Sequence, residues 1–227
     1  MEKQTAIIET RSLSEQVYQY FCSRIIEGSI TYGDGLNIKE IAKKLHVSSM
    51  PVREAIKRLE NEGLVTVKPR STCIVREPTK DTILNAIEMR EILEIHCIER
   101  TAPMINDRLL ERLQGIIVRM KAVIAEKPTE QSLRRYIALD RQFHTEICRL
   151  AGNEYIDKSY REVNLHLNMQ FIYEIAVPPD ILQTYKDHLR LLDALSKHSP
   201  RAVHDLRRHL KQSRKNILQG RLFNSLK

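Results

Sequence analysis

Hydrophobic residues follow different patterns in the two parts of the chain. Up to about residue 77, short apolar stretches at helical spacing alternate with glycines and with two β-branched runs, "LVTVK" and "CIVRE". Residues 79–224 instead form long stretches of helical periodicity that are separated by prolines and by "AGN", without a strand signal. We therefore predict a mainly α protein with two domains, residues 1–77 and residues 78–227.

Two short helices are predicted to open the first domain. Ser12 and Glu15 have the spacing of a capping box, and apolar residues then recur at helical intervals up to Gly28. A second helix is predicted to begin after Asn37, a good capping residue, and to end near His46. His46 and Val47 are expected to form a tight turn.

The stretch "SSMPVREAIKRLENEG" predicts a third helix with an apolar face and a basic face. Ser48 is its candidate cap, and Pro51 falls in the first turn, where backbone amides lack intrahelical partners. The two β-branched runs then flank a hairpin tip, "PRST". Three short helices and a basic hairpin indicate a winged helix-turn-helix, which places one helix in the major groove of DNA.

The predicted DNA contacts lie on the basic side of this domain. Nine Lys and Arg residues oppose four acidic residues between Lys39 and Arg76, where a phosphate backbone would lie. Arg53, near the start of the third helix, could reach a guanine edge or a phosphate. A solvated basic face in some other helical domain is the alternative. The predicted DNA-binding residues are Lys39, Ser48, Ser49, Met50, Arg53, Lys57 and Arg70.

Residues 25–70 resemble the DNA-binding domain of the GntR family of bacterial transcription regulators. The stretch "PVREAIKRLENEGLV" carries most of this resemblance, which places Arg53 at a DNA-contacting arginine and Lys39 at a frequent contact position. Two positions depart from the family pattern: Ser49 stands where arginine is usual, and Thr72 stands where the wing tip often has glycine. One DNA contact and the close approach of the wing therefore differ from what the family pattern implies.

The second domain places ionisable residues on apolar helix faces. Asp140 and His144 in "LDRQFH" are one turn apart on the inward stripe, His188 lies on the apolar stripe of its helix, and His209 lies at the edge of another. A buried carboxylate is costly unless it is paired or bound to a metal. One carboxylate and three imidazoles suit a divalent transition metal, with zinc as first choice and nickel or manganese as alternatives. Spacing alone leaves open a histidine that is merely hydrogen-bonded to Asp140.

Residues 80–222 resemble the all-helical FCD domain, the C-terminal domain of FadR-type regulators. The recurring motifs are "DRQFH" with "AGN", "HLRLLDAL" and "AVHDLRRHL". The resemblance implies an antiparallel helical bundle that binds an effector and holds a metal. The metal ligands of the family map onto Asp140, His144, His188 and His209.

Four residues are candidates for binding the effector. Arg90 lies on the inward stripe of the first helix of the second domain, with Glu94 one turn further on. Arg90 could bind an organic acid bidentately, although an ordinary ion pair between these two residues on a half-exposed face is the alternative. His166 lies on a polar helix face that could line a pocket, and Asn153 belongs to the "AGN" motif.

Composition adds the cellular setting. The net charge of +8 favours a polyanionic partner. The four cysteines lie far apart, without a CxxC pair or a preceding signal peptide, which favours free thiols in a reducing cytoplasm. No apolar run approaches the roughly 18 residues of a membrane helix, so no membrane partner is expected.

These features predict a DNA-binding transcriptional regulator and not an enzyme. We expect a homodimer to bind double-stranded operator DNA, under the control of a small carboxylate effector at the metal site. One alternative is a regulator that responds to the metal itself. Another is a metal-dependent hydrolase or isomerase fused to a DNA-binding module, against which the lack of an HExxH or similar base-bearing motif counts.

Overall fold

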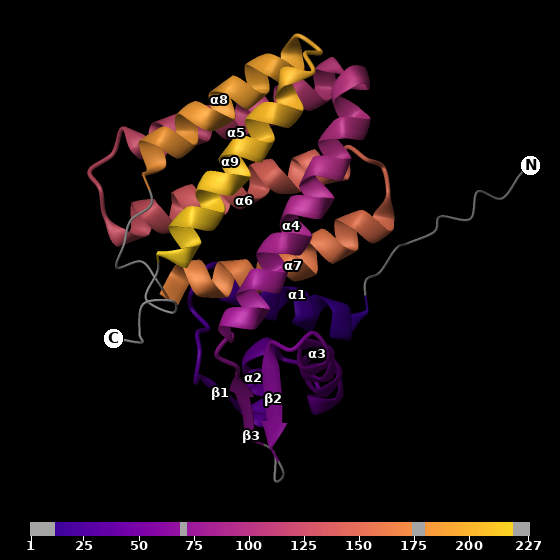
Figure 1. Ribbon diagram of the computed structural model, residues 1–227. Helices are drawn as coiled ribbons and strands as arrows, with labels where there is room; N and C mark the ends of the chain where they lie inside the picture. Colours follow the sequence, from indigo (N-terminus) through magenta and orange to yellow (C-terminus); the bar gives the residue numbers. More distant parts are fainter. Residues whose placement is uncertain (1–11, 69–71, 174–179, 220–227) are drawn as a thin grey trace, which may run out of the picture. The chain divides into compact units, whose positions relative to one another are not determined.

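The computed structural model describes residues 12–68, 72–173 and 180–219 (Figure 1). The chain divides into two compact units, one made of residues 1–25 and 29–77 and the other of residues 26–28 and 78–227. As the sequence predicted, it is mainly α-helical, with a small sheet next to the first three helices. These elements are α1 (Leu13–Ile26), β1 (Gly35–Leu36), α2 (Ile38–Leu45), α3 (Ser49–Asn61), β2 (Val65–Lys68) and β3 (Thr72–Val75).

The first two helices begin where their capping residues predict. The backbone N–H of Glu15 donates to the Ser12 hydroxyl at the start of α1. At the start of α2, the Asn37 side chain accepts from the backbone N–H groups of Lys39 and Glu40. His46 then closes α2 in the left-handed conformation, at φ +54°, and the chain turns into α3.

Helix α3 has the predicted proline in its first turn and a glycine directly after its end. Ser48 occupies the N-cap position in extended conformation, but its side chain makes no capping hydrogen bond. At the other end, Gly63 has φ +76°, and the N–H groups of Gly63 and Leu64 donate to the carbonyls of Glu60 and Leu59. This pair of bonds is a Schellman motif, which favours glycine because glycine adopts a positive φ without the steric cost that a side chain adds.

The wing contains one more strand than the sequence indicated. The two predicted β runs pair antiparallel as β2 and β3, from Val65 opposite Val75 to Lys68 opposite Thr72. The unpredicted strand β1 pairs with β3 on its other side, giving the order β1-β3-β2. Two residues are too short to show the alternation by which a strand is recognised. The predicted wing contact Arg70 lies outside the described residues.

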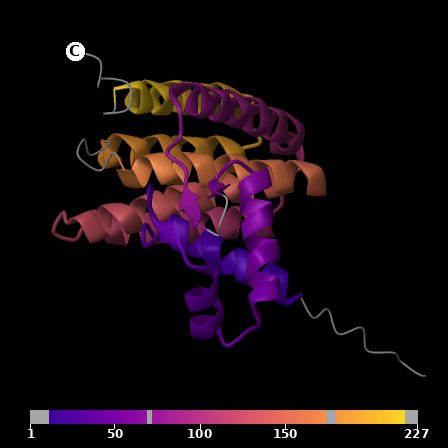
Figure 2. The same ribbon diagram turned by 90° about the horizontal axis from the view of Figure 1, so that it is seen from below.

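The second unit is a bundle of long helices. It contains α4 (Lys80–Thr101), the short 3₁₀ helix η1 (Ala102–Met104), α5 (Asp107–Ile124), α6 (Glu130–Arg149), α7 (Glu154–Tyr173), α8 (Ile181–Ser196) and α9 (Arg201–Leu218). Figure 2 shows α4 and α9 side by side, and α4 also packs against α6 and α7. Helix α8 packs against α5 and α9. The predicted helical bundle is therefore confirmed.

Apolar side chains fill the centre of this bundle. The largest fully buried ones include Phe143 of α6, Leu113 and Met120 of α5, and Ile98 of α4. Side chains also cap the helices here, as where Thr129 and Ser132 form a capping box at the start of α6. None of the helices in the described part of the chain combines the length and the apolar run that a membrane span needs.

Candidate metal centre and nucleic-acid interface

The described candidates for DNA binding lie on the solvent side of the helix-turn-helix. Met50, Arg53 and Lys57 are exposed on α3, while the opposite face of that helix buries apolar residues. Lys39 is exposed in the first turn of α2, and Ser48 is exposed at the α3 N-cap. Ser49 is half-buried. Helix α3 thus carries a continuous exposed face of the kind that enters a major groove.

The four predicted metal ligands come together in the helical unit. Helix α6 supplies Asp140 and His144, α8 supplies His188, and α9 supplies His209. One ligand atom from each residue lies within 4.8 Å of those of the other three. The Nε2 atom of His144 lies 3.0 Å from that of His209 and 3.1 Å from that of His188. The Asp140 carboxylate lies 3.4 Å from His188 Nε2.

A buried carboxylate fixes the orientation of the central imidazole. Glu94 of α4 is fully buried, and its Oε2 lies 2.6 Å from His144 Nδ1. Its Oε1 accepts from the Tyr160 hydroxyl and from Arg90 Nε, both at 2.6 Å. Burial opposes ionisation of Glu94, but the charge of Arg90, together with the hydrogen bonds to His144 and Tyr160, outweighs it and holds the pKa of this carboxyl well below its usual range.

An ionised Glu94 can only accept hydrogen bonds, so His144 Nδ1 must carry a hydrogen. A neutral His144 then presents Nε2 as a lone pair, and two other imidazole nitrogens approach that same atom. Nitrogen ligands about 2.1 Å from one ion lie about 3.0–3.4 Å apart in tetrahedral or octahedral sites. The spacing and the carboxylate behind His144 fit a divalent transition metal, because such a carboxylate commonly orients a metal-binding histidine.

The cluster also favours the neutral imidazoles that metal binding requires. Burial is the main reason that the pKa of His188 falls to about 3, with the attraction of Asp140 opposing it. Burial is also the main reason that the pKa of His209 lies well below its usual value. Both rings are therefore uncharged at neutral pH and offer lone pairs to a cation.

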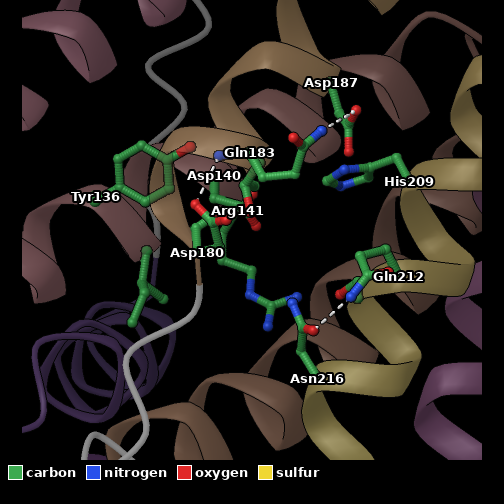
Figure 3. A pocket seen from close by; sticks show the side chains of 12 residues that line it. Tyr136, Asp140, Arg141, Asp180, Gln183, Asp187, His209, Gln212 and Asn216 are labelled. Atoms are coloured by element: carbon green, nitrogen blue, oxygen red, sulfur yellow. Dashed lines mark hydrogen bonds between the residues drawn. The ribbon is translucent and has the colours of Figure 1, made fainter.

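A cavity of about 250 Å³ opens onto this cluster (Figure 3). Asp140 and His209 form part of its wall, so a molecule in the cavity would contact the cluster directly. Six uncharged polar residues from three helices line much of the rest. They are Tyr136 of α6, Gln183 and Thr184 of α8, and Gln212, Ser213 and Asn216 of α9.

Arg141 is the arginine that lines this cavity. It follows Asp140 directly in α6, is 4% exposed, and extends along the cavity toward Asn216 in Figure 3. Burial, with the nearby Arg90 charge as a second cause, lowers the pKa of Arg141 to about 10. The guanidinium is therefore still a cation at neutral pH, on the wall next to the proposed metal ligands.

The predicted effector residues lie elsewhere. Arg90 is 2% exposed and pairs with Glu94 behind His144, so neither lines the cavity. The Asn153 side chain accepts from the backbone N–H groups at the start of α7, where it acts as a helix cap. His166 is half-buried in α7 and is also not part of the cavity wall.

Sequence reasoning missed most of the cavity lining, although a signal was present. Thr184 lies one turn before His188, and Ser213 one turn after His209, so each shares a helix face with a candidate ligand. Arg141 carries no such signal. Its neighbour Asp140 points at the cluster, and adjacent positions on a helix are expected to face different directions.

Known proteins match both units. Residues 85–212 match the family described as the FCD domain, and residues 13–75 match the bacterial regulatory proteins of the gntR family. The HTH-type transcriptional repressor RspR of Escherichia coli (strain K12) is 27% identical over 231 residues, which cover 99% of this chain and 97% of RspR. The gluconate operon transcriptional repressor of Bacillus subtilis (strain 168) is 28% identical over 170 residues, covering 75% of this chain and 67% of the repressor.

Solved structures show the same fold. E. coli McbR/YncC superposes with a TM-score of 0.81 at 21% identity, over 92% of this chain and 99% of that one. A putative GntR transcriptional regulator from Rhodococcus sp. RHA1 superposes with a TM-score of 0.78 at 22% identity, over 92% and 98% of the two chains.

The FCD match alone spans more than half of the chain, and the gntR match covers the helix-turn-helix and the wing. The matched families are those of bacterial regulatory proteins, so the protein is a DNA-binding regulator and not an enzyme. The chain belongs to the GntR family of bacterial transcriptional regulators, with an FCD domain after its winged helix-turn-helix.

Proposed function

We propose that this regulator is controlled by a small carboxylate that binds a metal ion in the helical unit. Asp140, His144, His188 and His209 would hold the ion, and zinc, nickel and manganese all suit this ligand set. The observation that carries the proposal is the convergence of three imidazole Nε2 atoms and one carboxylate next to a cavity that Asp140 and His209 line. A bound ion would supply positive charge and open coordination positions for the acid.

The protein side chains would position both the ion and the acid. Glu94 holds His144 in the tautomer that binds metals, and Arg90 supplies the counter-charge that keeps Glu94 ionised. Arg141 takes the role that the sequence suggested for Arg90, because it is the arginine on the cavity wall. A guanidinium there suits a carboxylate, which it can bind with two parallel hydrogen bonds.

For DNA recognition we propose that α3 reads the major groove. Arg53 would contact a guanine edge or a phosphate, and Met50 and Lys57 extend the same exposed face. Lys39 and the α3 N-terminus at Ser48 and Ser49 would contact the backbone, and Arg70 would do so from the wing. A homodimer would place two such helices on the half-sites of a palindromic operator in the cytoplasm.

Elemental analysis of full-length protein, purified without chelators or metal-affinity resin, tests the metal site. We expect about one equivalent of a divalent transition metal per chain, or uptake of one equivalent on titration. Less than about a tenth of an equivalent, with no uptake, would mean that the site is a hydrogen-bonded histidine cluster. Sedimentation of the same protein at micromolar concentration tests the dimer, which a single monomeric species would rule out.

A regulator of metal homeostasis is the second candidate, because the same ligand set could sense the ion itself. The two proposals differ in which molecule, the metal ion or an organic acid, releases the protein from operator DNA. Metal-stripped protein would be bound to operator DNA selected from a random duplex pool and then titrated, first with metal and then with a mixture of organic acids. A metabolite receptor should respond mainly to the acids in the presence of metal, and a metal sensor to the metal alone.

A further inference from the structure

We propose that a groove between α8 and α9 binds a chain of linked phosphates, such as the triphosphate group of a nucleotide or inorganic polyphosphate. The two helices pack against each other (Figure 1), and the groove has a volume of about 750 Å³. It shares Gln183, Asp187 and Gln212 with the wall of the cavity described above. None of the four proposed metal ligands lines it, so this site goes beyond the proposed function.

Positive charge dominates the lining of this groove. Its cationic residues are Arg190 of α8 and Arg208, Lys211, Arg214 and Lys215 of α9. All of them are exposed, and Asp187 is the one acidic residue among the described residues that line the groove. An anion in the groove would therefore meet several cations at once.

The two arginines next to Asp187 are available to an anion. Arg190 Nη1 donates to Asp187 Oδ1 at 2.9 Å, and Arg208 pairs with Asp205 at 3.0 Å and lies 4.0 Å from Asp187. The arginine side chains are 52% and 45% exposed, so water screens these ion pairs and makes them weak. Each guanidinium also has further N–H groups, with which it can bind a phosphate through two parallel hydrogen bonds.

Lys211 and Lys215 have no acidic partner. They lie one turn apart on α9, and neither side chain forms an ion pair or a hydrogen bond within the described part of the chain. Like charges at this spacing repel each other and destabilise a helix slightly. Arg214 adds a further positive charge next to Lys215, although it lies 3.5 Å from Glu91 of α4. A bound anion would relieve this repulsion.

The length of the basic lining favours several linked phosphates over a single one. From Arg208 to Lys215 the helix advances roughly 10 Å, and Arg190 lines the same groove from α8. One phosphate group is too small to contact all of these cations, whereas a chain of two or three can contact cations of both helices. The volume lies within the roughly 300–1,000 Å³ that is typical of small-molecule sites, which favours such a ligand over duplex DNA.

Calorimetric titration of the full-length protein, as purified and without added metal, tests the proposal. The probes are tripolyphosphate, ATP and GTP, with orthophosphate as the reference for a single phosphate. We expect at least one of the three chains to bind at least about tenfold tighter than orthophosphate, because each additional charge pair adds attraction. Equal affinities for tripolyphosphate and the nucleotides would identify the phosphate chain alone as the ligand, and a preference for one nucleotide would show that its base is also recognised. If none of the three binds more tightly than orthophosphate, the proposal is overturned.

Two double variants separate binding in the groove from general attraction by a basic protein. Lys211→Gln/Lys215→Gln should weaken binding of the phosphate chain by at least about tenfold, since it removes two cations of the groove. The matched control is Lys121→Gln/Lys158→Gln, which removes the same charge at exposed lysines of α5 and α7 that do not line the groove. The control should bind like the parent. Equal losses in the two double variants would contradict the proposal.

Two further results would overturn the proposal by assigning the anion or the groove differently. If Lys211→Gln/Lys215→Gln binds the phosphate chain like the parent, the anion binds elsewhere, as it would at the proposed metal site. If no phosphate chain binds but this variant weakens binding to duplex DNA, measured by fluorescence anisotropy, the basic lining contacts DNA instead. Neither result changes the metal content of the protein, which tests the proposed function separately.

Discussion

The two units of this regulator differ in whether their charged side chains are exposed or buried. The helix-turn-helix buries an apolar face and leaves Arg53 and Lys57 in solvent, where they are available to DNA. The helical unit places Arg90, Glu94 and His144 inside its core, each at most 2% exposed. The helix-turn-helix can therefore change its DNA contacts without changing its core, whereas in the helical unit the proposed binding site is part of the core.

This difference has an energetic consequence. A charge on an exposed helix face costs little to keep or to remove, because water solvates it in either case. A charge in the core is tolerated only with its partners, and deleting one partner leaves the other uncompensated. Substitutions should therefore alter binding alone in the first unit, and both binding and stability in the second.

The largest expected effect is the loss of the buried counter-charge. Glu94→Gln should lower the free energy of unfolding by about 3–5 kcal/mol, because it leaves Arg90 buried without an anion. Urea denaturation followed by circular dichroism would measure it. Glu99→Gln is the matched control, since Glu99 pairs with Arg207 on the surface of the same unit. It should cost about 0–1 kcal/mol, and similar losses in both variants would contradict the expected difference between a buried and an exposed ion pair.

The next effect is on metal affinity. His144→Ala should weaken metal binding by about 100-fold or more, because it removes the ligand whose Nε2 contacts the two other imidazoles. Competition with a chromogenic chelator would measure the dissociation constant. His204→Ala, at an exposed histidine of α9, should leave the affinity unchanged. Equal affinities in the two variants would remove His144 from the site.

A smaller effect is expected at the DNA surface. Arg53→Ala should weaken binding to a selected operator by about 1–3 kcal/mol if Arg53 contacts a base, and should reduce the salt slope by about one if it contacts a phosphate. Its thermal stability should stay close to that of the parent. Arg108→Ala, at an exposed arginine of α5, is the control. Fluorescence anisotropy at several salt concentrations tests this, and an unchanged affinity and slope would exclude the contact.

The smallest effects distinguish the two caps of the helix-turn-helix. Asn37→Ala should cost about 1 kcal/mol of unfolding free energy, because the Asn37 side chain accepts from two backbone amides. Ser48→Ala should cost only a few tenths, because Ser48 makes no capping hydrogen bond. Thermal denaturation of the two variants would rank them. A larger loss in Ser48→Ala would show that this cap forms in solution.

Much of the fold could be read from local pattern. The position of Pro51 and the glycine after α3 fixed the limits of that helix, because both residues act through their own backbone. The helical stripes likewise put Asp140, His144 and His188 on inward faces, and the structure brings these residues together with His209. Such predictions succeed because periodicity reports which side of a helix meets the core.

Other features depend on contacts between distant segments. Strand β1 forms because it pairs with the free edge of β3. Its two residues are too few to show a strand pattern in the sequence. Arg90 was correctly placed on an inward stripe, but only the packing of α4 against α6 and α7 shows that Glu94 contacts both His144 and Tyr160. Periodicity predicts which way a side chain points from its own helix, but not which residues of other helices it contacts.

The sequence by itself determined the class of protein, the helix proposed to read DNA and the inward-facing residues of the proposed metal site, since each depends on short-range spacing. Only the tertiary structure decided which arginine lines the cavity and which polar groups share its wall. Arg141 reaches the cavity although it is adjacent to Asp140, and residues of α6, α8 and α9 meet there. The physical reason is that side-chain direction is set locally by the backbone, whereas the walls of a cavity are set by how whole helices pack.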